Sequence, residues 1–246
     1  MSQLKPPSLQ HLARTWHASP DKIRAHLVQM ATHGPTFSYA PVGNAIRDHI
    51  QMHVPINTIE SSFNRLSRSN LRDDFRSIVK LAAKHFEKID PDFYVDMAGQ
   101  SYPVARDIRI PFETPFLYGK DGTLHVPWFC FWKSGALRGE RLSLFVTLAR
   151  EVLSRNPDLK DAKFYILDFG ASHAPKGREL RIIQGENVPQ LVSQKKNAML
   201  EQFVIGYRLA QNEIANRRRT ETSTRIVRVE APAPSNDLFR SDSQDG

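Results

Sequence analysis

The sequence predicts an α+β protein with a mixed sheet flanked by helices, and three observations support this fold class. Residues 1–95 carry apolar positions spaced by three and four, as amphipathic helices do. Residues 96–216 contain strand-like segments that alternate with two more helical ones. Residues 217–246 are rich in Thr, Ser, Pro and charge, which is typical of disorder. We therefore expect a helical N-terminal region, a sheet-containing α/β domain and a disordered C-terminal tail with these bounds.

The N-terminal region contains one strong helical pattern and several weaker ones. A helix is expected to begin at Pro20, with Ser19 as its cap, and to end at the "HGP" of residues 33–35. The strongest pattern covers residues 69–89, where one apolar stripe runs along the helix; its members are Leu71, Phe75, Ile78, Ala82, Phe86 and Ile89. Shorter helices are expected in the segments 9–17, 41–53 and 56–67.

The second region reads mainly as strands. Residues 102–112 alternate apolar and polar side chains, which predicts one half-buried strand. Residues 115–132 predict a hairpin that turns at 119–122, and Pro127 predicts that the second half is an edge strand or carries a bulge there. The continuous apolar run "KFYILDFG", 163–170, predicts a strand covered on both faces, with "ELRII" as its neighbour.

Two helices complete this region. Apolar residues in helical register predict a helix over 139–155. A long helix is expected to begin at Asn187, with Asn187 as its cap and Pro189 in its first turn.

The charge distribution favours an anionic partner. The formal net charge is +8, and residues 101–219 alone carry a net +7 from 19 Lys/Arg and 12 Asp/Glu. A basic folded surface attracts nucleic acid, acidic proteins or membrane surfaces. Our leading hypothesis is a non-catalytic binding protein for nucleic acid; the contact residues we expect are Lys133, Arg138, Arg141, Lys176 and Arg178, with Lys22 and Arg24 from a helix-turn-helix-like segment at 9–27.

The aromatic run "WFCFWK" bears on the same hypothesis. On a strand, Trp128 and Trp132 share one face, and we expect the run to be buried core. If the two tryptophans were instead exposed beside Lys133 and Arg138, they could stack single-stranded bases.

A nuclease is the first alternative. Asp168 ends an apolar run, and Glu179-Leu180-Arg181 follows after ten residues. This order of elements and acids is similar to that of the PD-(D/E)XK nucleases, in which two carboxylates hold a divalent cation such as Mg²⁺ that activates water. Arg181 departs from the pattern because it stands where a lysine is expected, and arginine does not exchange protons near neutral pH. Without this activity we expect no cofactor.

A protein-interaction scaffold is the second alternative, with the tail and the aromatic strand as contact segments. Cys130 is the only cysteine, so it can form neither an intramolecular disulfide nor a zinc cluster, and we expect it to be buried. The N-terminus lacks the apolar core of a signal peptide, and no run is long enough to cross a bilayer. These observations predict a soluble, cytoplasmic protein with no membrane partner.

Overall fold

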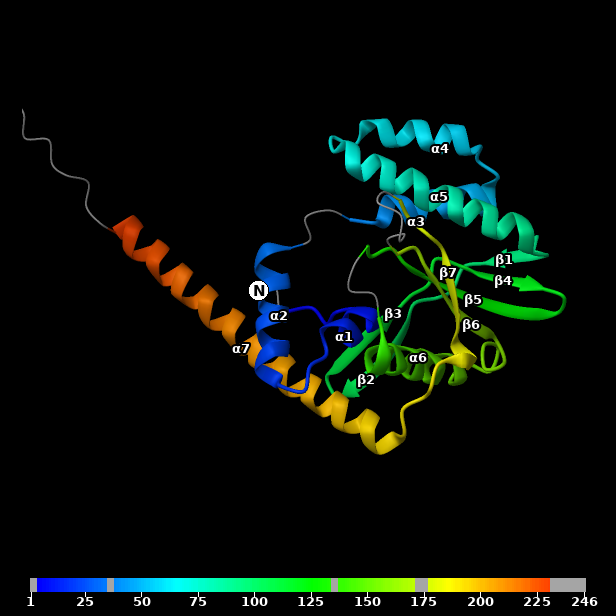
Figure 1. Ribbon diagram of the computed structural model, residues 1–246. Coiled ribbons are helices and arrows are strands. Elements are labelled where there is room, and N and C mark those ends of the chain that lie inside the picture. Colours follow the sequence, from blue (N-terminus) through cyan, green and yellow to red (C-terminus); the bar gives the residue numbers. More distant parts are fainter. Residues whose placement is uncertain (1–3, 35–37, 134–136, 171–176, 231–246) are drawn as a thin grey trace, which may run out of the picture.

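The protein is a five-stranded mixed sheet with helices on both faces, and a separate two-stranded hairpin lies on one side (Figure 1). The computed structural model describes residues 4–34, 38–133, 137–170 and 177–230, with side chains up to residue 217. The helices are α1 (Leu9–Thr15), α2 (Pro20–His33), α3 (Ala40–Met52), α4 (Ile56–Ser62), α5 (Ser69–Ile89), α6 (Gly139–Ser154) and α7 (Ser193–Glu230), with short 3₁₀ turns at Phe63–Arg65 and Gly185–Asn187. The strands are β1 (Phe93–Val95), β2 (Gln100–Ala105), β3 (Ile108–Phe112), β4 (Leu117–Lys120), β5 (Thr123–Cys130), β6 (Lys163–Asp168) and β7 (Arg181–Gln184). The expected fold class is confirmed in this α+β layout.

The order of the strands in the large sheet is β1-β4-β5-β6-β7. The central pair β5–β6 is parallel, and every other pair is antiparallel. A parallel pair needs a crossover connection, and α6 supplies it between these two strands. The β4–β5 hairpin turns at Asp121-Gly122, where both residues have positive φ, as tight hairpins require. The expected hairpin and the expected pairing of "KFYILDFG" with "ELRII" are therefore confirmed.

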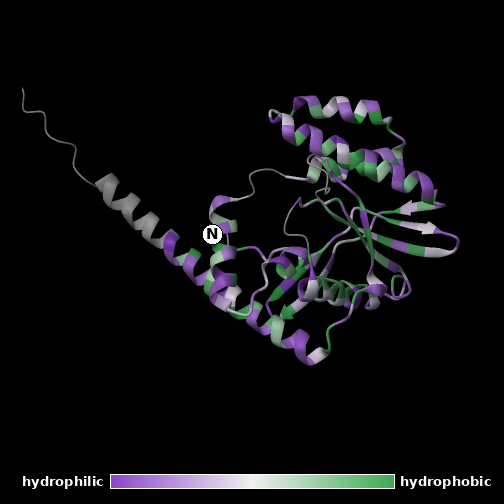
Figure 2. Ribbon diagram, in the orientation of Figure 1, coloured by the Kyte–Doolittle hydropathy of each residue, from purple (hydrophilic) through white to green (hydrophobic). Residues whose placement is uncertain are grey.

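A different set of helices covers each face of the sheet (Figures 1 and 2). Helices α3, α4 and α5 cover one face, where Phe75 and Phe86 belong to the same apolar cluster as Phe129 and Leu167 of the sheet. This cluster combines side chains from both sides of the expected boundary at residue 95. Each central strand sends alternate residues to opposite faces, so burial on both sides explains why β6 reads as a continuous apolar run.

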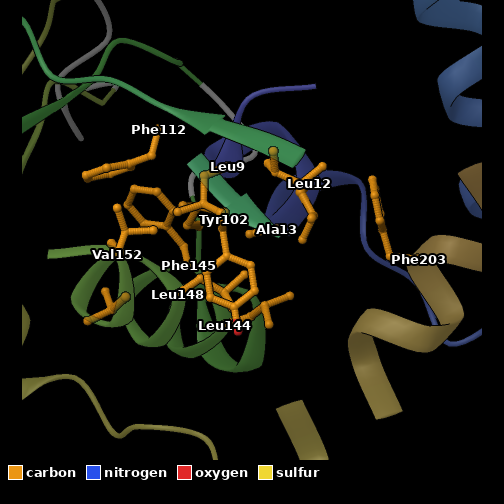
Figure 3. Packing of buried hydrophobic residues seen from close by; sticks show 14 of the residues in the cluster. Leu9, Leu12, Ala13, Tyr102, Phe112, Leu144, Phe145, Leu148, Val152 and Phe203 are labelled. Atoms are coloured by element: carbon orange, nitrogen blue, oxygen red, sulfur yellow. The ribbon is translucent and has the colours of Figure 1, made fainter. Parts of the chain in front are cut away.

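The opposite face is covered by α6, the β2–β3 hairpin and the chain's first helix (Figure 3). Leu9, Leu12 and Ala13 of α1 are almost fully buried, and they pack with Phe112 of β3 and Phe145 of α6. Burial of a leucine or phenylalanine side chain contributes about 1.5–3 kcal/mol, so a seven-residue helix can be fixed in place. This packing determines where the polar side of α1 points.

Helices α2 and α7 pack along each other at the outer edge of this layer (Figure 1). Gly206 of α7 allows the close approach, since a Cβ there would lie 2.7 Å from both the Pro20 carbonyl oxygen and the Ile23 Cβ. Arg24 of α2 donates to Glu213 of α7 at 2.5 Å. The second helix of the expected helix-turn-helix segment therefore packs on α7, which it contacts through Ile23 and Arg24.

Three local expectations are corrected by the structure. Residues 102–112 form two strands, because the chain turns at Arg106-Asp107. The alternation continues across the turn because a register shift between Pro103 and Ala105 keeps the buried residues in step. Strand β5 is central, and it tolerates Pro127 because the ladder with β4 ends at His125.

The direction of the Pro127 carbonyl group shows why the lack of an N–H at this residue does not disrupt the sheet. The N–H and C=O of one strand residue point to the same side, and the Pro127 carbonyl accepts a hydrogen bond from the Thr114 hydroxyl. An N–H at this residue would point toward the segment before β4, which forms no ladder with β5 at this position.

The last helix begins at Ser193 instead of Asn187. Between them, the Leu191 amide donates to the Thr147 hydroxyl of α6 at 3.0 Å, and Val188 is buried. Tertiary contacts thus hold this segment outside the helix, in spite of the local cap signal. The helix continues to Glu230, and residues 231–246 of the expected tail lie outside the described residues. Within the described part of the chain, no helix combines the length and apolarity needed to cross a membrane.

Candidate functional site

Asp168 and Arg181, two residues of the nuclease hypothesis, are partners in an ion pair. They lie opposite each other at the β6–β7 end of the sheet, and the Arg181 Nη2 is 2.5 Å from the Asp168 Oδ2. Asp168 is buried, whereas Arg181 is exposed. The amide of Glu179 donates to the Gly170 carbonyl at 3.2 Å, which continues the pairing.

The described residues contain no group of three or more His, Cys, Asp or Glu side chains that could hold a metal ion. A Mg²⁺ site needs several oxygen ligands with room for water. The geometry instead gives Asp168 a cation from its own chain as partner.

Cys130 is buried beside Asp168 in the parallel ladder between β5 and β6. Burial raises the pKa of its thiol to about 12, and the Asp168 charge contributes in the same direction. A thiol in this state is protonated at neutral pH and is a poor nucleophile. The expectation of a buried, hydrophobe-like cysteine is confirmed.

A concave feature lies where β5 ends between the two helical layers. It is a cleft of about 1170 Å³, and its walls come from α1, the start of α3, the start of α5 and the residues that follow β5. Its charged and aromatic lining includes His11, Arg14, Tyr39, Arg68, Trp132 and Lys133. These side chains meet because successive residues after β5 point toward opposite helical layers, as Phe131 and Trp132 do. The cleft opens where these two layers separate.

The cleft carries a surplus of positive charge. Arg14, Arg68 and Lys133 line it, against the single carboxylate of Asp74. The Lys133 Nζ lies 2.8 Å from Asp74 Oδ1, and the buried Arg178 lies 3.4 Å from Asp74 Oδ2. Asp74 thus faces two cations. Neither Arg14 nor Arg68 forms an ion pair with a side chain that the structure describes.

Aromatic rings form part of the same walls. On the α1 side, the Arg14 guanidinium lies over the Trp132 ring at 4.3 Å from its centroid, and the His11 ring lies 5.3 Å from Trp132. On the α3–α5 side, Tyr39 and Phe131 stack at 5.4 Å between centroids with an interplanar angle of 29°. All five side chains are half-buried, so each ring both supports the wall and exposes surface to the cleft.

His11 adds a titratable group to the cleft. Burial lowers its pKa below the ordinary value of 6.5, and the positive charges of Arg14 and His26 lower it further. The pKa of His26 is shifted in the same direction by burial, Arg14 and Arg141. The imidazoles are thus neutral at pH 7, and an anion bound beside them would favour their protonated forms. The chemistry that this arrangement supports is anion binding with aromatic contact.

The structure places the sequence-predicted contact residues in different settings. Lys133 lines the cleft, and Arg141 lies close enough to influence His26. Arg138 and Lys22 are exposed, while Arg24 is paired with Glu213. Trp132 is half-buried, whereas Trp128 is core at 5% exposure.

Arg178 was expected at the surface, and the structure corrects this expectation. Its side chain is fully buried, and it donates to the backbone carbonyls of Phe131 and Phe169 at 2.7 and 2.8 Å. It therefore supports the cleft from below and is not a surface contact. Lys176, another predicted contact residue, lies outside the described residues.

Sequence reasoning missed the cations on the opposite walls. Arg14 and Arg68 lie far from Lys133 along the chain, and only the packing of α1 and α5 brings them to one cleft. The neighbouring pair Trp132-Lys133 was the one local signal, an aromatic residue beside a basic one.

The chain matches no family model, and no curated protein matches it in sequence. Its function is therefore inferred from the geometry of the cleft.

Proposed function

We propose that this protein binds nucleic acid in the cleft at the end of β5, through phosphate contacts to Arg14, Arg68 and Lys133. The observation that carries the proposal is the surplus of cations around this cleft, two of which have no ion-pair partner among the described side chains. Phosphate groups are the counter-charges that Arg and Lys bind most readily, and Arg binds them in a fork geometry.

The open rim of the cleft suits a polymer. Small-molecule pockets are typically about 300–1,000 Å³ and largely enclose their ligand. The cleft, at about 1170 Å³, is near the upper end of this range, and its rim residues Arg68 and Lys133 are exposed. A chain of nucleotides could enter and leave such a site while its phosphates contact the rim.

The partner in this proposal is the anionic one inferred from the net charge, but the contact surface differs from the expected one. The expected surface lay mainly within residues 101–219, with Lys22 and Arg24 from the N-terminal region, whereas the cleft takes Arg14 and Arg68 from that region. Arg141, a predicted contact residue, extends the positive surface beyond Arg14 toward His26.

The test is the salt dependence of oligonucleotide binding, measured by fluorescence anisotropy with the full-length protein. Removal of one phosphate-binding cation should reduce the slope of log K against log salt by about 0.7 for a single strand and 0.9 for a duplex. We expect this reduction for each of the variants R14Q, R68Q and K133Q. In K133Q, Asp74 keeps Arg178 as its partner, so the change is confined to the rim.

The matched control is K84Q, a lysine-to-glutamine change on the helix that follows Arg68. Lys84 is exposed and lies 15 residues after Ser69, which is about 22 Å along the helix axis. Its substitution should leave the slope unchanged. The proposal would be contradicted if no oligonucleotide bound at low salt, or if K84Q and K133Q reduced the slope of log K against log salt equally.

A further inference from the structure

We infer that the cleft accepts an unpaired strand of nucleic acid in preference to a duplex, with bases against its aromatic rings and phosphates at its rim. This inference rests on the proposed function and adds the form of the ligand. It depends on where the rings lie relative to the cations.

The aromatic residues occupy the walls of the cleft, and part of the charge occupies its rim. Trp132 and Phe131 are consecutive residues that face opposite walls, and both are half-buried. Arg68 and Lys133 are exposed. A ligand must therefore place flat apolar groups inside the cleft while its charges remain near the opening.

A duplex cannot meet this requirement. Its bases are stacked and paired inside the helix, and its outer surface presents phosphates and sugars. An unpaired strand can rotate its bases outward and stack them on aromatic side chains or on a guanidinium plane. On the α1 wall, the half-buried Trp132 ring, with the Arg14 guanidinium over it, supplies such a platform. On the opposite wall, Phe131 stacks on both Tyr39 and Phe169 and contributes apolar surface.

The neutral groups at the rim favour binding without strong sequence preference. Ser67, Ser69 and Asn70 line the opening at the start of α5, and their side chains are exposed. Hydroxyl and amide groups can donate to phosphate oxygens of any nucleotide. Stacking is similarly tolerant, since every base has an aromatic face.

The experiment compares a labelled oligonucleotide of about 12 nucleotides, within the usual site size for single strands, with its duplex at the same salt concentration. We expect the single strand to bind at least about tenfold more tightly than the duplex. W132L should weaken single-strand binding by roughly 5- to 150-fold, the range for loss of one stacked base, whereas W132F retains a ring and should stay near wild type. Oligo-dT and oligo-rU versions distinguish DNA from RNA as the source of the strand.

A second measurement needs no destabilising substitution. Stacking of a base on Trp132 should quench part of the intrinsic fluorescence of the wild-type protein, and W132F should lose that part. Equal affinity for strand and duplex, or equal affinity of W132L and W132F for the strand, would overturn the inference while the proposed function stood. Failure of both probes to bind would remove the proposed function itself.

Discussion

Arg178 and Asp74 form an ion pair that joins the edge of the sheet to α5. The Arg178 Nη2 lies 3.4 Å from the Asp74 Oδ2, and the Arg178 side chain is fully buried. The same guanidinium donates to the carbonyls of Phe131 and Phe169, which follow the ends of the two central strands. One side chain therefore fixes the floor of the cleft to the helix that forms its wall.

Substitution of Arg178 by glutamine should strongly destabilise the protein. Loss of one partner from a buried ion pair typically costs about 3–5 kcal/mol, because the remaining polar groups are left buried without partners. In R178Q, the carbonyl groups of Phe131 and Phe169 would lose their donor, and Asp74 would lose one of its two cations. Urea unfolding followed by circular dichroism measures the change in the free energy of unfolding.

The control for R178Q is R208Q, the same change in an exposed pair. Arg208 donates to Asp107 at 2.6 Å on the surface of α7, where water can take the place of the guanidinium. We expect a small effect, as is usual for exposed ion pairs. If R178Q were no more harmful than R208Q, the buried pair would not hold the cleft together.

Cys130 should resist alkylation until the protein unfolds. With a pKa of about 12, only roughly one thiol in ten thousand is ionised at a pH near 8, and the thiolate is the form that reacts. Burial excludes the reagent as well. Mass spectrometry after iodoacetamide treatment should show no adduct in buffer and complete labelling in urea. Rapid labelling of the native protein would mean that β5 is accessible, contrary to its central position in the sheet.

Much of the fold was predictable where one local signal agreed with the tertiary environment. Helix α5 runs from Ser69 to Ile89, the range predicted from its apolar stripe, because that stripe faces the sheet. The β4–β5 hairpin was predictable because Asp121-Gly122 can adopt the positive φ values of a tight turn. The start of α7 was not, since the contact of Leu191 with Thr147 overrides the cap signal at Asn187.

The candidate site was predictable only in part. Trp132 and Lys133 gave a local signal because they are adjacent in the sequence. Arg14 and Arg68 gave none, because they lie on separate elements and reach the cleft only through packing. Arg178 looked like a surface cation, and its burial follows from Asp74, a partner about a hundred residues away. Convergence from separate elements is the part of a site that local patterns do not encode.

The stability of the protein should fall in mild acid. The pKa values of His11, His26, His85 and His125 are all lowered from 6.5 in the folded protein, chiefly by burial. Above that value both the folded and unfolded chains hold these residues neutral, so they do not affect stability. As the pH falls below 6.5, the unfolded chain takes up protons first, and the free energy of unfolding decreases.

The variant H85F tests this pH dependence. His85 lies among Phe86 and Tyr165, and its Nε2 is buried without a hydrogen-bond partner, so a phenyl ring suits the site. The decline in urea midpoint from about pH 7.5 to about pH 5.5 should be smaller in H85F than in wild type. The exposed His33 gives the matched change, H33F, which alters no buried surface. An equal decline in all three proteins would argue against burial of His85 as a cause.

Substitution of Gly206 by alanine should separate α2 from α7. The new Cβ would lie 2.7 Å from the Pro20 carbonyl oxygen and from the Ile23 Cβ, and neither atom can move without a shift of the backbone. Overpacking of this kind costs about 1–3 kcal/mol, which exceeds the gain in helix propensity of up to about 1 kcal/mol from removing a glycine. The control is G43A on α3, where nothing beyond the adjoining residues and the local helix backbone lies within 4 Å of the new Cβ, so that only the propensity gain applies. Thermal unfolding should therefore move in opposite directions for the two variants. A stabilised G206A would mean that α2 does not pack against α7 at this distance.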